Sequence, residues 1–176
     1  GIFFDIEGAF NNVTSKAVQV ALDERCIATP VKKWITTMLT KRSIYTTLGE
    51  DKVWVNVDRG LPQGGGLSPN LWSLVADSLL KLLNNQGPFS QGFADDGTVV
   101  IVGTFLPVIC EIAQRLLGSI ETWCKQRDLS VHPDKTVTVL FTKKRILDGL
   151  IPIKFYGKEL EFSPHVKYLG VWLDSK

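Results

Sequence analysis

The apolar positions of the chain follow two patterns, short runs and longer stretches with helical spacing. The short apolar or alternating runs predict β-strands. They cover residues 1–6, 43–58, 89–102, Thr136 to Phe141 and 153–173. Gly49-Glu50-Asp51 and Asp95-Asp96-Gly97 interrupt two of these runs, so each of the two predicts a hairpin. Turns at Gly157 and Pro164 divide the last run into several short strands.

Four stretches carry apolar residues at the spacing of a helix face. They should begin near Thr14 or Ser15, after Thr29-Pro30, at Ser68-Pro69 and near residue 106. The second helix has one apolar face, made by Val31, Trp34, Ile35, Met38 and Leu39. The third, ending at about Asn84, is apolar on nearly every side and should be buried. The fourth, over 106–127, has a stripe of Leu106, Ile109, Cys110, Ala113, Leu116, Leu117, Ile120 and Cys124.

The order of these elements indicates the fold class. Strands and helices mix without strict alternation, one hairpin is central, and a glycine-rich loop runs from Gly60 to Gly66. Such an order predicts an α+β fold with an antiparallel-rich sheet and helices packed on one face.

Composition narrows the picture only slightly. The 176 residues suit one domain, 44% hydrophobic residues exclude a disordered chain, and a net charge of +2 neither supports nor excludes a polynucleotide partner. His132 and His165 lack ligand-spaced partners, so we expect no histidine zinc site. Three cysteines without CxxC spacing predict buried, reduced thiols and an intracellular protein, nuclear or cytoplasmic. No apolar run reaches the roughly 18 residues of a membrane span.

Three aspartates stand at the ends of predicted strands. Asp5 ends the first strand, and Asp95 and Asp96 form the tip of the central hairpin. Adjacent strands lie about 4.8 Å apart, so carboxylates at such ends can share metal ions. The alternative is an ordinary Asp-Asp-Gly hairpin turn beside an unrelated strand-end carboxylate.

An ordered set of motifs resembles the palm of reverse transcriptases. Asp5-Ile6-Glu7-Gly8-Ala9-Phe10 resembles the first palm motif, and Leu61-Pro62-Gln63-Gly64-Gly65-Gly66-Leu67-Ser68-Pro69 the second. Phe93-Ala94-Asp95-Asp96 is similar to the third, with Phe where Tyr is commoner. Pro133-Asp134-Lys135-Thr136 and Tyr168-Leu169-Gly170-Val171 are similar to the fourth and fifth. The residues of these motifs are most similar to those of the enzymes of non-LTR retrotransposons.

The resemblance implies a role for each residue of the metal site. Asp5 and Asp95 would bind two Mg²⁺ ions, with Mn²⁺ as a possible substitute, and Asp96 would support them. The backbone carbonyl of Ile6 would join the metal shell. Lys135 would protonate the departing pyrophosphate as a general acid, or it is a solvated lysine at a strand start.

The resemblance also implies residues that contact the nucleotide and the primer. Phe10 would lie under the sugar and exclude a 2′-hydroxyl, unless it is a core aromatic. Gln63 and Gly64 would lie against the templating base pair. Leu169 and Gly170 would form the primer grip, or only a tight turn beside a core leucine.

The implied activity is RNA-directed DNA polymerase, a nucleotidyltransferase that uses an RNA template, a DNA primer and dNTPs, with no membrane partner. Residues 1–150 would form the palm, and 151–176 a primer-grip hairpin region leading towards a missing thumb. The fingers would be absent, so these 176 residues alone should be inactive. A catalytically silent palm-like nucleic-acid-binding remnant of a mobile element and a nucleotidyl cyclase are the alternatives. The basic run 143–145 could contact phosphate, although such runs are usually solvated.

Overall fold

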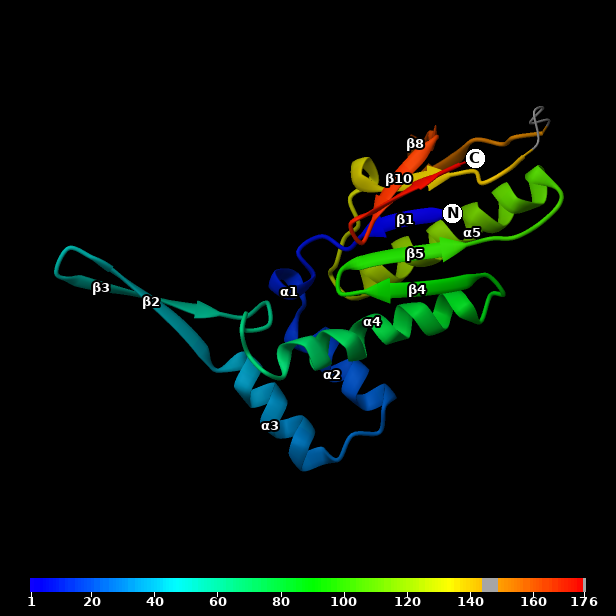
Figure 1. The fold of residues 1–176 in the computed structure, drawn as a ribbon. Helices are drawn as coiled ribbons and strands as arrows, with labels where there is room; N and C mark the ends of the chain where they lie inside the picture. The colour runs from blue at the N-terminus through cyan, green and yellow to red at the C-terminus, as the bar shows by residue number, and fades with distance from the viewer. Residues whose placement is uncertain (144–148, 176) are drawn as a thin grey trace. The chain divides into compact units, whose positions relative to one another are not determined.

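A computed structural model describes residues 1–143 and 149–175, so only Lys143 of the basic run is described. The chain forms two compact units. The first comprises Gly1–Glu7 and Asp77–Lys176, and the second comprises Gly8–Ala76. Figure 1 shows both, and each is described by itself below. The predicted boundary between residues 150 and 151 stays a prediction.

The first unit is built on a mixed, mainly antiparallel sheet. Its five strands lie in the order β4-β5-β1-β6-β9, and only β6 and β9 run parallel. The strands are β4 (Phe89–Phe93), β5 (Asp96–Val100), β1 (Ile2–Asp5), β6 (Val137–Val139) and β9 (Phe162–Ser163). This arrangement confirms the α+β fold with an antiparallel-rich sheet.

The other elements of the first unit follow β5 along the chain. They are α5 (Leu106–Gln126), the 3₁₀ helix η1 (Pro133–Lys135), and the hairpins β7 (Ile153–Phe155) with β8 (Lys158–Leu160) and β10 (His165–Tyr168) with β11 (Val171–Asp174). The strand predicted from Thr136 to Phe141 is shorter than expected, since β6 covers only Val137–Val139. Just before it, η1 has Pro133 in its first turn, where the missing amide proton costs no hydrogen bond.

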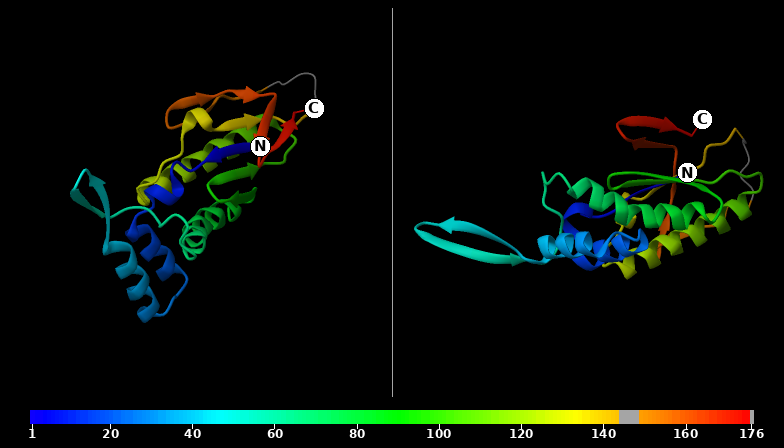
Figure 2. Two further views of the ribbon diagram at one scale, coloured as in Figure 1. Left: turned by 60° about the vertical axis from the view of Figure 1, so that its left-hand side comes forward. Right: turned by 90° about the horizontal axis from the view of Figure 1, so that it is seen from below.

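Helices cover one face of the sheet. Phe4 and Gly97 are direct partners across β1 and β5, and their side of the sheet carries the fully buried Val99. Gly92, the partner of Gly97, lies against Leu80 of α4 (Ser68–Asn84). The indole of Trp123 in α5 donates a hydrogen bond of 2.8 Å to Ser78 of α4, which links the two helices. Figure 2 shows both helices running along the sheet.

The β10–β11 hairpin packs on the other face. Phe3 points to that side and lies with Val139 and Val166 in one apolar cluster. The ring of Tyr168 completes the cluster, with its centroid 5.4 Å from that of Phe3. Because side chains alternate between the two faces along β1, Asp5 lies on the same face as Phe3, two residues further along the strand.

The second unit holds three helices, a hairpin and the start of α4. The elements are α1 (Ala9–Asn12), α2 (Ser15–Glu24), α3 (Thr29–Thr40), β2 (Arg42–Leu48) and β3 (Asp51–Val57). The hydroxyl of Thr14 accepts a hydrogen bond of 3.1 Å from the amide of Ala17, which confirms the predicted cap. The boundary between the two units falls within α4.

Two burial predictions were wrong. α4 is buried on one side only, since Leu82 is 39% exposed. In the apolar face of α3, Ile35 and Leu39 are buried whereas Val31 and Trp34 are exposed. Cys26 is exposed at the end of α2, while Cys110 and Cys124 are buried as expected. In each case the pattern located apolar residues but not the surface available to cover them.

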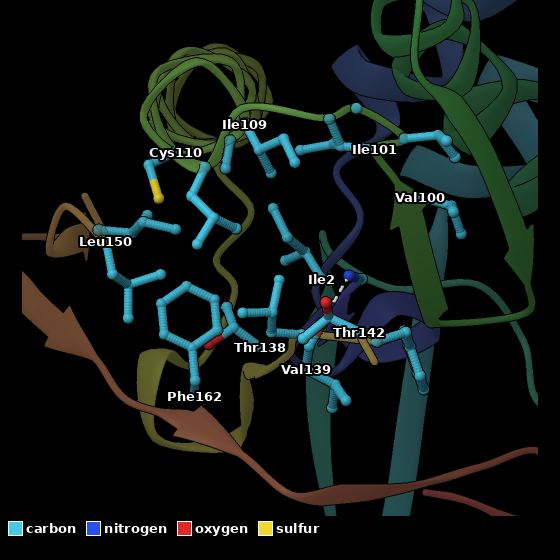
Figure 3. Close-up of a pocket in the computed structure, with 18 of the residues that line it drawn as sticks. Ile2, Val100, Ile101, Ile109, Cys110, Thr138, Val139, Thr142, Leu150 and Phe162 are labelled. Carbon is cyan, nitrogen blue, oxygen red and sulfur yellow. Dashed lines mark hydrogen bonds between the residues drawn. The ribbon is translucent and has the colours of Figure 1, made fainter. Parts of the chain in front are cut away.

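An apolar pocket lies at the end of β1 that is remote from Asp5. Figure 3 shows it, and side chains of Ile109, Cys110, Leu150 and Phe162 reach into it. The backbone ammonium of Gly1 donates a hydrogen bond of 2.8 Å to the carbonyl of Val139 at its edge. The side-chain lining of this pocket is largely apolar, and it includes none of the candidate site residues.

Candidate active site

Strand register brings the three predicted aspartates to one end of the sheet. Asp5 of β1 is the direct cross-strand partner of Asp96 in β5. Opposed residues in antiparallel strands have Cα atoms about 5 Å apart and side chains on the same face. The carbonyl of Asp95 accepts a hydrogen bond of 3.0 Å from the amide of Ile6, so β1 continues along the hairpin turn.

The turn that carries Asp95 is tight and strained. Phe93 and Asp96 close it as cross-strand partners, leaving Ala94 and Asp95 as the two turn residues. Ala94 has φ of 53°, in the left-handed region that disfavours residues with a Cβ. Strained backbone of this kind persists only where the surrounding structure fixes it, and it concentrates at functional sites. This strain could not be predicted from the local sequence, because Gly97 follows the aspartates and a residue with a Cβ, Ala94, takes the left-handed position.

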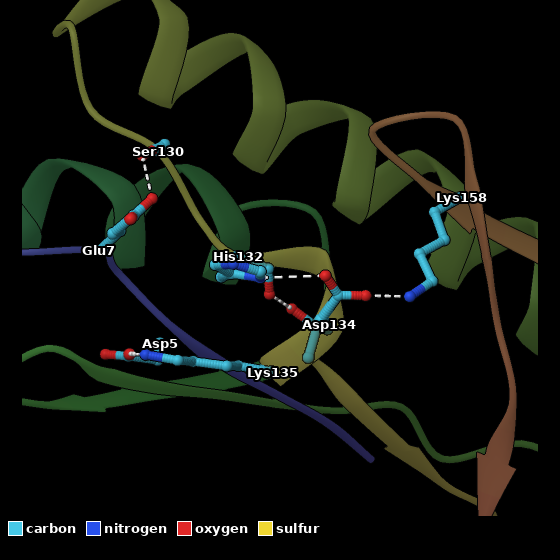
Figure 4. A network of polar contacts seen from close by, with 8 residues as sticks. Asp5, Glu7, Ser130, His132, Asp134, Lys135 and Lys158 are labelled. Carbon is cyan, nitrogen blue, oxygen red and sulfur yellow. Dashed lines mark hydrogen bonds and ion pairs between the residues drawn. The ribbon is translucent and has the colours of Figure 1, made fainter.

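Negative charge accumulates at this end of the sheet. Burial, and then the charges of Asp95 and Asp5, raise the pKa of Asp96 above its usual value. The ammonium nitrogen of Lys135 lies 3.6 Å from the Oδ2 of Asp5 and supplies a positive charge beside the cluster (Figure 4). A site where like charges repel one another and attract a cation suits binding of a divalent metal ion.

A set of polar contacts around η1 holds Lys135 beside β1. Glu7 accepts a hydrogen bond of 2.9 Å from the hydroxyl of Ser130, just before η1. Asp134 pairs with Lys158 of β8, and this contact lowers the pKa of Asp134 below its usual value (Figure 4). None of these partners was predicted, since they lie 24 residues or more from one another along the chain.

The predicted nucleotide-binding residues lie together in the second unit. Phe10, Gln63 and Gly64 line one open pocket, beside Pro62 and Ser68. Phe10 is partly exposed, and its ring centroid lies 6.1 Å from that of Trp72. It therefore packs against the core of this unit without being enclosed by it.

The glycine-rich loop is fixed at both ends. Arg42 donates a hydrogen bond of 2.6 Å to the carbonyl of Gly60, and the hydroxyl of Ser68 donates one of 2.6 Å to the carbonyl of Pro62. Gly60 has φ of 79°, and a Cβ there would lie 2.8 Å from the carbonyl oxygen of Asn11. Only glycine fits at this position, so Gly60 fixes where the glycine-rich loop begins. The anchoring role of Arg42 was not anticipated from the sequence.

The predicted primer-grip residues form the turn of the β10–β11 hairpin. Tyr168 and Val171 are partners, and both intervening residues have positive φ, 48° at Leu169 and 83° at Gly170. This is the pattern of a tight two-residue hairpin turn. The tight turn that the alternative named is therefore present, but Leu169 is 45% exposed and is not a core leucine.

Among residues 1–143 and 149–175, no group of three or more His, Cys, Asp or Glu side chains is arranged to hold a metal ion. No helix in these ranges combines the length and apolar character needed to cross a bilayer.

Comparison with known proteins relates these features to a family. Residues 1–173 match the family model described as reverse transcriptase (RNA-dependent DNA polymerase). The chain is 30% identical over 173 residues to a retrovirus-related Pol polyprotein from the type-1 retrotransposable element R1 of Bradysia coprophila, covering 98% of this chain. It is 30% identical over 174 residues to a putative 115 kDa protein in type-1 retrotransposable element R1DM of Drosophila melanogaster, covering 97%. It is 25% identical over 181 residues to a probable RNA-directed DNA polymerase from transposon BS of the same fly, covering 99%.

The mixed α+β fold, with carboxylates at the tip of a central hairpin, is consistent with a polymerase palm. The chain belongs to the reverse transcriptase family. Its relatives come from non-LTR retrotransposons, which confirms the resemblance noted in the motifs. The chain spans 17% and 16% of the length of the first two relatives.

Proposed function

We propose that this chain is the catalytic palm of an RNA-directed DNA polymerase, which extends a DNA primer with dNTPs on an RNA template. The proposal rests above all on the register that makes Asp5 and Asp96 direct partners beside the Asp95 turn, in a chain of this family. The proposed reaction joins the primer 3′-oxygen to the α-phosphorus of the dNTP and breaks the bond to pyrophosphate. It would take place inside the cell, where dNTPs are present.

The chemistry of the three carboxylates fits a hard divalent cation. Mg²⁺ prefers oxygen ligands and is commonly held by one or two protein carboxylates, with substrate phosphates and waters completing its shell. A preformed cage of three side chains is therefore not required. We assign Asp5 and Asp95 as ligands, with Asp96 and the carbonyl of Ile6 in support. When bound, two Mg²⁺ or Mn²⁺ ions would favour ionisation of the primer hydroxyl and offset the charge of the leaving group.

Lys135 is proposed to donate the proton that the leaving pyrophosphate needs. The support is its place on η1, with the ammonium 3.6 Å from Asp5 and the side chain 62% exposed. A charged amine in that position can reach a ligand beside Asp5, and it carries a transferable proton. Removing it should slow the chemical step more than it weakens nucleotide binding.

The residues around the open pocket of the second unit are proposed to select the nucleotide. Phe10 would exclude a 2′-hydroxyl by its bulk. Gln63 and Gly64 would lie against the base pair, where a residue without a side chain permits close approach of the backbone. The turn at Leu169 and Gly170 would hold the primer, within a primer-grip region that we place at residues 151–176.

The test is primer extension by the full-length protein on an RNA template with Mg²⁺. Asp5→Asn and Asp95→Asn should each lower the extension rate at least ~10³-fold, equivalent to about 4 kcal/mol of activation free energy. The matched control is Asp128→Asn, which removes the same charge from an exposed residue of the same unit. Its φ of 53° suits Asn as well as Asp, so the backbone should not change.

The results of this assay distinguish the proposed polymerase from the catalytically silent remnant. Loss of extension in both site variants, with normal extension by Asp128→Asn, would support the assignment. A wild-type protein that binds template and primer but never extends them would instead be the catalytically silent remnant. Normal extension by either site variant would remove that aspartate from the metal site.

A further inference from the structure

The hairpin formed by β2 and β3 has two chemically different faces. Within the part of the chain that the structure describes, the two strands pair only with each other, with Tyr45 opposite Trp54. Since side chains alternate along a strand and opposed residues share a face, the register assigns every residue to one side. The aromatic face consists of Ser43, Tyr45, Thr47, Lys52, Trp54 and Asn56. The opposite face, here called the aliphatic face, carries Arg42, Ile44, Thr46, Leu48, Asp51, Val53, Val55 and Val57.

The two rings of the aromatic face lie side by side and exposed. Tyr45 is 58% exposed and Trp54 is 61% exposed. Their centroids are 4.8 Å apart with an interplanar angle of 37°. Large exposed aromatic groups in contact are typical of surfaces that bind a partner, because contact with water alone is unfavourable for them.

The charge on the aromatic face is positive. Lys52 is its only charged residue, and its ammonium lies 5.5 Å from the centroid of the Tyr45 ring. The acidic residues of the hairpin lie elsewhere, since Glu50 is in the turn and Asp51 pairs with Leu48 on the aliphatic face. A polyanion approaching the two rings would therefore meet a lysine and no carboxylate.

We propose that the aromatic face of this hairpin binds a single-stranded polynucleotide, whose bases stack on Tyr45 and Trp54 while Lys52 contacts a phosphate. Aromatic platforms flanked by basic residues bind single strands in this way, with little dependence on sequence, because every base has a π-face. Ser43, Thr47 and Asn56 supply hydroxyl and amide groups around the rings. The inference rests on the proposed function in taking a polynucleotide as the partner.

A protein partner fits the other side of the hairpin better. The aliphatic face offers exposed Ile44, Val53 and Val55, which have no stacking surface. Its one cation, Arg42, donates hydrogen bonds to backbone carbonyls of the same unit. Because the two faces point in opposite directions, a protein on the aliphatic face would leave Tyr45 and Trp54 free for a nucleic acid.

The test is fluorescence anisotropy of a labelled 12-nucleotide single-stranded RNA, without dNTPs, titrated with the full-length protein. A second probe is an abasic phosphodiester oligomer of the same length, which keeps the charge but has no bases. The Tyr45→Ala, Trp54→Ala double variant should weaken RNA binding by at least about 25-fold, the product of about 5-fold for each lost stacking ring, and leave binding of the abasic probe unchanged. Lys52→Gln should reduce the dependence of log Kd on log salt concentration by about 0.7.

Two matched controls exclude a general effect of removing surface aromatics. Trp54→Phe keeps a stacking ring and should retain most of the affinity. Trp34→Ala removes a tryptophan that is 57% exposed on α3 of the same unit, and RNA binding should not change. Far-ultraviolet circular dichroism of each variant should match the wild type, since none of these side chains is buried.

Unchanged RNA affinity in the double variant would overturn the inference, as would an equal loss with both probes. A change of sedimentation coefficient without loss of RNA binding would make the aromatic face a protein interface, again overturning it. Failure of the proposed function is recognised separately. A protein that extends no primer but binds RNA through Tyr45 and Trp54 would refute the polymerase and keep the stacking platform.

Discussion

Replacing Gly97 by alanine should disturb the pairing that aligns Asp5 with Asp96. Gly97 lies next to Asp96 and opposite Phe4, and an added Cβ would lie 2.3 Å and 2.4 Å from two atoms of the Phe4 ring. Carbon atoms pack at about 3.5 Å or more, so the ring or the strand would have to move by about 1 Å. Phe4 is only 3% exposed, so its ring has no free space to enter. Overpacking of this kind costs about 1–3 kcal/mol.

Hydrogen–deuterium exchange of the full-length protein measures this cost where it arises. Amides of β1 and β5 should exchange about 5- to 150-fold faster in Gly97→Ala, the factor that corresponds to 1–3 kcal/mol of local opening. Gly118→Ala is the control, because nothing lies within 4 Å of its added Cβ on α5 and alanine favours a helix. Combining Gly97→Ala with Phe4→Leu should cost less than the sum of the two single changes. Wild-type exchange in Gly97→Ala would refute the steric argument.

Three further predictions concern other parts of the chain. Phe10→Val should lower the ratio of kcat/KM for dNTPs over rNTPs, and an unchanged ratio would limit Phe10 to packing against Trp72. Thr14→Ala should destabilise α2 by about 1 kcal/mol, seen as faster amide exchange over that helix, whereas an unchanged rate would mean that the cap contributes nothing. At pH 8 a maleimide should label the exposed Cys26 well before Cys124, because burial raises the pKa of the Cys124 thiol to about 11. Equal labelling rates for the two cysteines would contradict the burial of Cys124.

Local pattern predicted the elements of this fold well, because each depends on residues close in sequence. The hairpin around Asp95 and the α2 start at Thr14 both follow from short-range chemistry, namely turn formation and capping. Element limits were less accurate, as the short β6 shows. Apolar helical spacing matched burial in α5, whose stripe is largely buried. It did not match burial at Trp34 of α3, because no other segment of the described structure covers that side chain.

The candidate site was predicted in its residues but not in its contacts. Placement at predicted strand ends and the order of the motifs together singled out Asp5, Asp95 and Asp96 as candidates. The salt bridge between Lys135 and Asp5 spans 130 residues, and no local pattern encodes such a distance. The strain at Ala94 likewise arises from the need to close the turn between two paired strands.

The sequence by itself determined the class of elements, the family and the identity of the candidate ligands, because periodicity, turn chemistry and motif order are all local properties of the chain. Only the tertiary structure decided the register of β1 against β5. A shift of that pairing by one residue would turn one of the two aspartates to the opposite face of the sheet, since side chains alternate with a period of two. The steric fit of Phe4 against Gly97 opposes such a shift and keeps Asp5 opposite Asp96.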